Sequence, residues 1–234
     1  MRVRLRHTKL GKVRFVSHRD LARVWERTVR KASLPIAYSE GFSPRPKLHF
    51  GLALSVGHES LAEYIDIDLS SGGGVAIEEL PELVSAVLPD GIDVTGARQV
   101  ADNEPALQAV VSSVTWRFRT PETDASALGA RLDSVLAAET MPLAVVRKGK
   151  PQEVDLRPQL LRAEITGSDG VTGLEVDLAT EGRSVRPDEL LAALEVPVDG
   201  TRVLRVEQWM NVDGLRQPPL PAEPSRSLLA EAIG

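Results

Sequence analysis

Cysteine is absent from this 234-residue chain, and its absence excludes several classes of function. Without thiols the chain forms no disulfide and holds neither a Cys-ligated zinc ion nor an iron–sulfur cluster. Long hydrophobic runs are missing as well: no window reaches the roughly 18 apolar residues of a membrane span, and no apolar run of a signal peptide follows the charged start. We therefore expect a soluble, cytoplasmic protein that carries no cofactor.

Charge is divided unevenly along the chain, although the net charge is only −5. Residues 1–60 contain 13 Lys and Arg against 4 Asp and Glu, whereas the remainder contains 15 against 29. Such a division is typical of a protein whose basic part meets a polyanion while the rest stays acidic. Attraction between the two parts of the chain is the alternative explanation.

Periodicity in the first hundred residues predicts alternating strands and helices. In the segment Arg2–Arg6, Val3 and Leu5 are expected to face inward and the three arginines outward. Ser17 is a predicted N-cap, with Asp20 three residues later. In chain order we expect strands at 2–6 and 13–16, a helix at 18–32, strands at 48–54 and 64–69, a helix at about 79–88 and a strand from 92.

A similar order is expected in the second half, with strands at 116–119, 144–146, 174–178 and 203–206 and helices at 128–136 and 187–195. The fold class is therefore α+β, with two tandem ferredoxin-like units of βαββαβ type. The expected domains are 1–105 and 113–214, joined by a linker within 101–112. A Pro-rich mobile tail is expected at 215–234.

An arginine stripe is the clearest functional signal. Arg19, Arg23 and Arg27 are spaced by four residues, so they share one face of the predicted helix. Like charges at this spacing oppose each other by roughly 0.2–0.5 kcal/mol per pair, a cost that an external anion would offset. Docking on acidic residues of the same chain, Asp66 and Asp68 included, is the alternative.

The segment from Gly41 to Gly51 is the second signal. Its prolines stiffen the chain and leave Arg45 and Lys47 projecting, and Phe42 and His49 have rings that stack on bases in single-strand binders. For Phe42 alone, a place in the core is the more common outcome.

The remaining candidates are basic or histidine side chains. No pair of histidines has the spacing of zinc ligands, so no metal site is predicted. His18, His49 and Lys47 are the weak catalytic candidates for acid–base chemistry on a phosphodiester. The predicted nucleic-acid contacts are Arg4, Arg14, His18, Arg19, Arg23, Arg27, Phe42, Arg45, Lys47, Lys148 and Lys150.

Several motifs together resemble one known family. They are Lys9-Leu10-Gly11 with Arg14-Phe15, Ser17-His18-Arg19-Asp20-Leu21, Gly41 to Lys47, the Gly57/Glu59-Ser60/Glu63-Tyr64 set, and the later RKGK and VDLRP segments. This combination is similar to the radical-SAM-linked family, a domain of unknown function often fused behind a B12-binding-type radical SAM protein. Arg19 departs from the pattern, since the family usually has an apolar residue there. The resemblance implies a radical SAM partner, which would be a separate protein here.

These observations favour an accessory protein that binds RNA or a ribonucleoprotein and works with a radical SAM enzyme in trans, without being an enzyme on its own. The RNA part depends on the basic first 60 residues and on analogy with RNA-binding ferredoxin-like modules. A metal-independent endoribonuclease is one alternative, and a protein–protein adaptor without RNA is the other.

Overall fold

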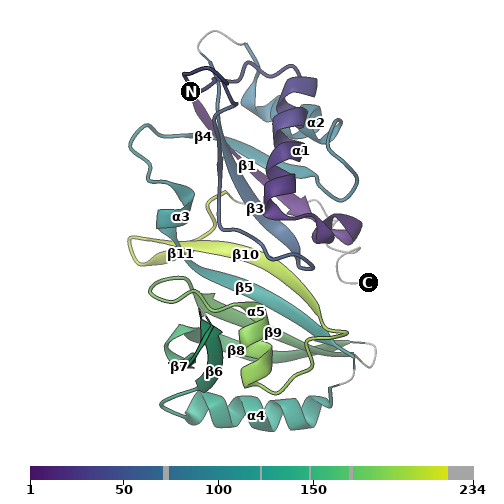
Figure 1. The fold of residues 1–234 in the computed structure, drawn as a ribbon, viewed down its shortest axis with the longest axis vertical. Coiled ribbons are helices and arrows are strands. Elements are labelled where there is room, and N and C mark those ends of the chain that lie inside the picture. The colour runs from purple at the N-terminus through teal and green to yellow at the C-terminus, as the bar shows by residue number, and fades with distance from the viewer. Residues whose placement is uncertain (71–73, 122, 148, 169–170, 221–234) are drawn as a thin grey trace. The chain divides into compact units, whose positions relative to one another are not determined.

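The computed structural model describes residues 1–70, 74–121, 123–147, 149–168 and 171–220. The chain forms two compact units. Unit 1 comprises residues 1–110 together with the chain from 211 onward, and unit 2 comprises residues 111–210. The mixed α+β class expected from the sequence is confirmed in both units (Figure 1).

Unit 1 is built on an antiparallel sheet with the strand order β4-β1-β3-β2. The order β1-α1-β2-β3-α2-β4 along the chain is that of the ferredoxin-like pattern. The elements of unit 1 are β1 (Arg2–Lys9), η1 (Gly11–Phe15), α1 (His18–Lys31), β2 (Leu48–Phe50), β3 (Glu59–Asp68), η2 (Ile77–Glu79), α2 (Leu80–Ser85), β4 (Val94–Val100), α3 (Leu107–Val110) and β11 (Leu215–Gln217).

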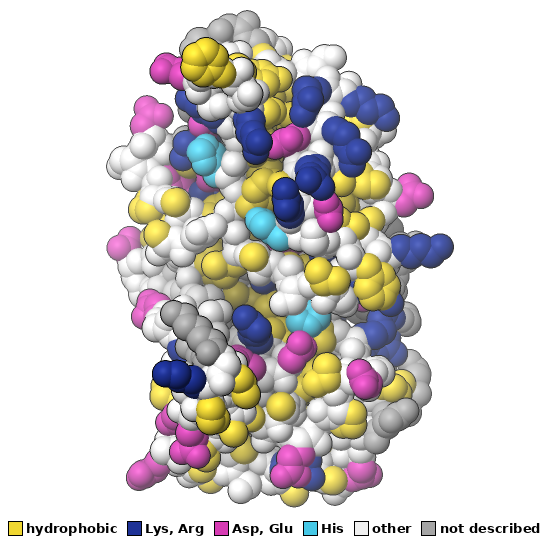
Figure 2. Space-filling view, viewed as in Figure 1, with side chains coloured by type: hydrophobic (Ala, Val, Ile, Leu, Met, Phe, Trp, Pro, Cys, Tyr) yellow, Lys and Arg dark blue, Asp and Glu magenta, His cyan; other side chains and the backbone are white. Residues whose placement is uncertain are grey.

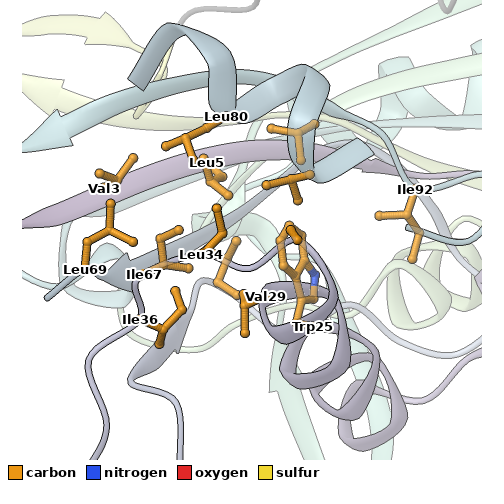
Figure 3. Close-up of a cluster of buried hydrophobic side chains, with 14 of the residues drawn as sticks. Val3, Leu5, Trp25, Val29, Leu34, Ile36, Ile67, Leu69, Leu80 and Ile92 are labelled. Carbon is orange, nitrogen blue, oxygen red and sulfur yellow. The ribbon is translucent and has the colours of Figure 1, made fainter. Parts of the chain in front are cut away.

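The core of unit 1 lies between one face of this sheet and the helices. Figure 3 shows Trp25 and Val29 of α1 among the inward side chains of the strands. Val3 and Leu5 of β1 are fully buried in this cluster, as the alternation predicts, and Leu80 of α2 joins them. Both helices therefore cover the same face of the sheet.

Helix α1 begins and ends close to where the sequence places it. The Ser17 side chain accepts a hydrogen bond from the Asp20 backbone N–H, which satisfies one of the free donors at the helix start. The buried residues Leu21, Trp25, Thr28 and Val29 recur at helical spacing. The predicted N-cap is confirmed.

The strand predicted at 13–16 is wrong, because this segment is the 3-10 helix η1. Gly11 has φ +64, a conformation that glycine adopts readily, and it turns the chain out of the sheet. The Lys9 ammonium donates to the carbonyl groups of Arg14 and Val16 and holds the turn in place. Period-two alternation over four residues did not reveal this turn.

Unit 2 has the strand order β10-β5-β9-β8, with every pair antiparallel. Its helices are tied together by Arg131, whose guanidinium donates to the Leu194 carbonyl at 2.8 Å. The elements that begin in unit 2 are β5 (Val111–Thr120), α4 (Ala125–Ala137), β6 (Pro142–Arg147), β7 (Lys150–Asp155), η3 (Arg157–Gln159), β8 (Leu160–Ser168), β9 (Val171–Ala179), α5 (Pro187–Ala193) and β10 (Arg202–Val212).

The strand expected at 144–146 is present, but it is not part of the main sheet of unit 2. It belongs to β6, which pairs with β7 in a separate two-stranded sheet. The strand between α4 and β9 in the main sheet is β8, which the sequence analysis missed. With the β6–β7 hairpin set aside, unit 2 has the same βαββαβ order as unit 1.

The two segments that flank unit 2 are structured within unit 1. Leu107 of α3 and Leu220 are both buried against Ala62 and Tyr64 of β3. The Tyr64 hydroxyl donates to the Leu220 carbonyl at 3.3 Å. Part of the expected linker therefore covers the sheet face opposite the helices. Of the expected mobile tail, residues 221–234 lie outside the described residues.

Candidate nucleic-acid interface

The arginine stripe lies on the outer face of α1. Leu21, Trp25 and Val29 face the core, and residues 19, 23 and 27 are on the opposite side of a helix with 3.6 residues per turn. All three arginines are exposed, Arg23 with 59% of its side chain. At a rise of about 1.5 Å per residue they follow one another every ~6 Å along the axis, which is comparable to the spacing of phosphates along a strand.

The stripe is only partly neutralised. Arg23 pairs with Asp20 at 2.9 Å, and Arg30, which extends the outer face, pairs with Glu26 at 3.7 Å. Within the described parts of the chain, Arg19 and Arg27 make no ion pair. Figure 2 shows Lys and Arg side chains gathered over α1. Two cations of the stripe thus remain available to an external anion.

Docking of the stripe on Asp66 and Asp68 is contradicted by the structure. Both carboxylates lie on the other face of the sheet, where Arg4 donates to Asp66 and Arg2 donates to Asp68. Strand alternation separates them from the helices, because their neighbour Ile67 points into the core beneath α1.

The start of α1 already holds an anion of its own. The Asp20 carboxylate accepts hydrogen bonds from the Ser17 hydroxyl at 2.8 Å and from Arg23 at 2.9 Å. These two contacts, that of Ser17 foremost, hold the pKa of Asp20 below its usual range. A phosphate at this helix terminus would have to displace Asp20, so the accessible positive charge lies farther along the stripe.

Arg4 was predicted to point outward and to contact nucleic acid, but it is buried. Its guanidinium donates to Asp66 at 2.8 and 3.0 Å and to Glu104 at 2.6 Å, and its side chain has no exposed surface. Glu104 belongs to the segment expected to be a linker, which covers this face together with Leu107 and Leu220. Arg4 therefore stabilises this face of the sheet, and the prediction that it contacts nucleic acid is wrong.

Glu104 joins Arg4 to a second guanidinium. Arg98 of β4 donates to both oxygens of Glu104, at 2.6 and 2.8 Å, and to the Pro219 carbonyl at 2.9 Å. Hydrogen bonds from Arg98, with the nearby charge of Arg4, hold the pKa of Glu104 below its usual range. The sequence offered no signal for Glu104, since it lies outside any periodic segment.

Arg14 is half-buried at the end of η1. Its guanidinium donates to the Gly11 carbonyl at 3.2 Å, lies 3.9 Å from the Glu59 carboxylate and stacks 4.5 Å from the centre of the Phe15 ring. These contacts give Arg14 a role in holding the turn before α1. A phosphate contact at Arg14 stays a prediction.

The two histidines proposed as an acid–base pair lie on opposite faces of the unit 1 sheet. The His18 ring meets the Phe50 ring edge-on at 5.2 Å on the helix side. His49, one residue before Phe50, points to the other side, where its Nε2 lies 3.2 Å from Asp68 Oδ2 and 3.4 Å from Arg2. Since the sheet separates them, His18 and His49 cannot act together on one phosphodiester, and Lys47 cannot complete that constellation.

Asp68 is the centre of a small charged cluster around His49. Burial raises the pKa of Asp68, but hydrogen bonds from Arg2 and His49 outweigh it, and the net pKa lies below the usual range. The cluster is partly exposed, with Asp68 itself 20% exposed. The His49 ring is therefore held in place by its contacts with Asp68 and Arg2.

The loop before β2 presents Phe42, Arg45 and Lys47 to solvent. Phe42 is fully exposed, with a relative exposure of 111%, so the expectation of a core position for this residue is wrong. Arg45 and Lys47 are exposed as predicted. Tyr38, at the start of the same loop, is 45% exposed and was missed; an aromatic residue in a Pro- and Gly-rich connector was the available signal.

The basic turn of unit 2 joins β6 to β7. The backbones of Arg147 and Lys150 are partners in the strand pairing at this turn, and Gly149 has φ +73. Lys150 is exposed, while Lys148 lies outside the described residues. A hairpin accounts for this sequence, and a phosphate contact at Lys150 stays a prediction.

Among the described residues, no three His, Asp or Glu side chains are grouped as a metal site requires. Likewise, no helix in this part of the chain is both long and apolar enough to cross a membrane.

Comparison with known proteins identifies the family of the chain. No curated protein matches it significantly. A family profile described as "Uncharacterized protein conserved in bacteria (DUF2344)" matches residues 2–187, a range that contains β1 to β9 and ends at the first residue of α5. With most of its length covered by this match, the chain belongs to the DUF2344 family of conserved bacterial proteins.

Proposed function

We propose that this protein binds RNA, free or within a ribonucleoprotein, through the outer face of α1, and that it serves a radical SAM enzyme in trans as an accessory protein. The observation that carries the RNA part is the exposed row Arg19, Arg23 and Arg27, of which the first and last have no ion pair among the described residues. The radical SAM part depends on the family resemblance alone.

The sheet face of unit 1 opposite the helices is covered, which favours α1 as the RNA-binding surface. Many RNA-binding βαββαβ modules stack bases on aromatic residues of the exposed sheet. Here that face carries the ion pairs of Arg4 and is covered by Leu107 and Leu220, and its aromatic residue Tyr64 is buried. An RNA strand would therefore follow the stripe instead of the sheet.

Long-range charge also favours a polyanion. The stripe belongs to the segment 1–60, which contains 13 basic and 4 acidic residues. Clustered exposed cations raise association rates with a polyanion and make its binding strongly salt-dependent. The rest of the chain is acidic, which would limit non-specific binding elsewhere.

The deciding experiment measures RNA affinity against salt for the whole chain and for a variant with Arg19, Arg23 and Arg27 all replaced by Gln. Each phosphate contact that is lost should flatten the log–log salt slope by roughly 0.7–0.9. A control variant with Arg162, Arg186 and Arg202 replaced by Gln removes the same charge from exposed positions of unit 2 and should keep the slope. Equal losses in both variants, or no binding of total cellular RNA at low salt, would reject the proposal.

The partnership needs its own test. Tagged protein isolated under mild conditions should bring down RNA together with a radical SAM protein, identified by mass spectrometry. Recovery of RNA without any radical SAM protein would restrict the proposal to RNA binding. Recovery of an acidic protein partner in place of RNA, lost in the stripe variant, would support an adaptor instead.

A further inference from the structure

Aromatic side chains are scarce in this chain, and two of them stand exposed on one loop. The chain has three Trp, two Tyr and four Phe. Four of these nine residues are buried, namely Trp25, Tyr64, Trp116 and Phe118. Tyr38 and Phe42, four residues apart before β2, are 45% and 111% exposed. Covering such an exposed ring with a ligand would remove its apolar surface from water, which is favourable.

The loop that carries these rings is closed at its base by backbone pairing. Tyr38 and Pro46 form an antiparallel bridge, and the Ser39 N–H donates to the Arg45 carbonyl at 2.9 Å. The Arg45 N–H in turn donates to the Ser39 hydroxyl at 3.0 Å, and the Lys47 N–H donates to the Ala37 carbonyl at 2.9 Å. The loop is therefore held in shape before any ligand binds, which lowers the entropy lost on binding.

The tip of the loop is shaped by Gly41, whose φ of +123 is a conformation that other residues rarely adopt. Apart from Gly41 itself and its two neighbours in the chain, no residue has an atom within 4 Å of the position where a side chain would begin at Gly41. Phe42 follows directly at this turn, and its ring is fully exposed. An apolar ring at such a position is placed to meet a flat partner.

Charge on the loop matches a nucleic acid. Arg45 and Lys47 are exposed and make no ion pair in the part of the chain that the structure describes. The loop's single acidic residue, Glu40, lies between the two rings in the sequence, so the loop carries two cations against one anion. Exposed rings combined with nearby cations are the features by which proteins bind single strands, because rings stack on unpaired bases and cations meet phosphates.

We infer that Tyr38 and Phe42 form a stacking site for unpaired nucleobases, with Arg45 and Lys47 beside it for phosphates, so that the RNA class bound is single-stranded. This inference rests on the proposed RNA function and deepens it. A duplex keeps its bases stacked inside the helix, where a projecting ring cannot reach them. The stripe on α1 would serve either kind of RNA, whereas the loop discriminates between them.

The test compares fluorescent single-stranded and duplex RNA of equal length, titrated with the whole chain and its variants. Phe42→Ala should weaken single-strand binding by roughly 5- to 150-fold, the effect of losing one stacked base, and leave duplex binding and the salt slope unchanged. Tyr38→Ala should act in the same direction. Because the Phe42 side chain is fully exposed, the melting temperature of the Phe42→Ala variant should equal that of the wild type.

Matched controls separate stacking from general damage. Phe42→Trp should keep single-strand affinity and show quenched tryptophan fluorescence on binding, while Phe42→Leu, apolar but without a ring, should behave like Ala. Phe15→Ala removes another ring, which is 61% exposed and has the Arg14 guanidinium stacked on it. This variant should have little effect on single-strand affinity.

The outcomes also distinguish the two proposals. Equal affinity for duplex and single strand with no effect of Phe42→Ala would overturn the stacking site and leave the stripe intact. Full affinity in Phe42→Leu would overturn stacking in favour of a simple apolar contact. Absence of binding to either RNA at low salt would reject the proposed function itself.

Discussion

Glu104 accepts hydrogen bonds from Arg98 through both of its oxygens, at 2.6 and 2.8 Å, on the sheet face of unit 1 that lies opposite the helices. The same carboxylate accepts from the fully buried Arg4 at 2.6 Å. One carboxylate thereby bridges two guanidinium groups that face each other from neighbouring strands, β1 and β4, while Asp66 supplies a second negative charge to Arg4. This arrangement makes the face structural, and the proposed RNA binding is therefore assigned to α1 and the loop before β2.

Replacing Glu104 by Ala should destabilise the protein strongly. Arg4 would keep Asp66, but its remaining donors would be buried without a partner, and removing one member of a buried ion pair costs about 3 kcal/mol or more. Chemical denaturation should register this loss. The matched control is Glu164→Ala, which removes the exposed partner of Arg162 and should have the small effect of a surface pair. Similar losses in both variants would contradict the structural role of Glu104.

Protonation of His7 should destabilise the fold as the pH falls. His7 is buried against Trp25, with 5.0 Å between ring centres, and burial lowers its pKa in the folded chain. Below the unfolded value of about 6.5, the unfolded chain therefore binds more protons than the folded chain, and stability drops as the pH falls. Melting temperatures measured from about pH 7.5 to pH 5.5 should decrease.

The contribution of His7 can be isolated by substitution. His7→Phe keeps a ring against Trp25 but does not titrate, so the decrease over this pH range should become smaller. His18→Gln removes an exposed imidazole and should leave the decrease unchanged. A pH profile that is the same in wild type and His7→Phe would show that His7 is not its source.

Removing the negative charge of Asp20 should strengthen RNA binding while weakening the helix. Asp20→Asn frees Arg23 from its 2.9 Å ion pair and removes an anion from the start of the stripe. The helix loses a favourable charge in its first turn. Affinity at low salt should rise, and thermal stability should fall slightly. Asp133→Asn, an exposed change of equal charge on α4, should alter neither, and an equal gain there would point to net charge alone.

The stripe itself should be dispensable for folding. Replacing Arg19, Arg23 and Arg27 by Gln removes two like-charge pairs, each unfavourable by roughly 0.2–0.5 kcal/mol, and one weak pair with Asp20. The melting temperature should therefore stay constant or rise slightly. The corresponding Lys variant keeps the charge but loses the bidentate geometry of arginine, so its salt slope should be retained. A marked loss of stability in the Gln variant would mean that the stripe docks on another part of the chain.

Several features of the fold follow from local sequence and could be predicted. Helix α1 is one: its cap at Ser17 and its inward row of Leu21, Trp25 and Val29 depend on residues only a few positions apart. The outward direction of Arg19, Arg23 and Arg27 follows from the same spacing, because a helix places residues four apart on one face. The α+β class follows from the alternation of such segments.

Pairing of strands could not be predicted in the same way. The sequence analysis placed residues 144–146 in the main sheet of unit 2, whereas β6 pairs only with β7, and β8 takes the expected place next to β9. Both segments are able to form strands, and the choice depends on which one packs against β9 and α4. Local periodicity contains no information about that competition.

What the sequence by itself determined is therefore the class of the fold, the absence of any thiol-held cofactor, and the direction of the arginine stripe on α1. Tertiary structure alone decided that Arg4 is buried and Phe42 exposed. Arg4 alternates outward in its strand, but Glu104 and the chain around Leu220, far away in sequence, fold over it. Phe42 has the character of a core residue, yet the pairing of Ser39 with Arg45 closes the loop beneath it and holds the ring in solvent. In both cases the neighbours that decide exposure are brought together only by the folded chain.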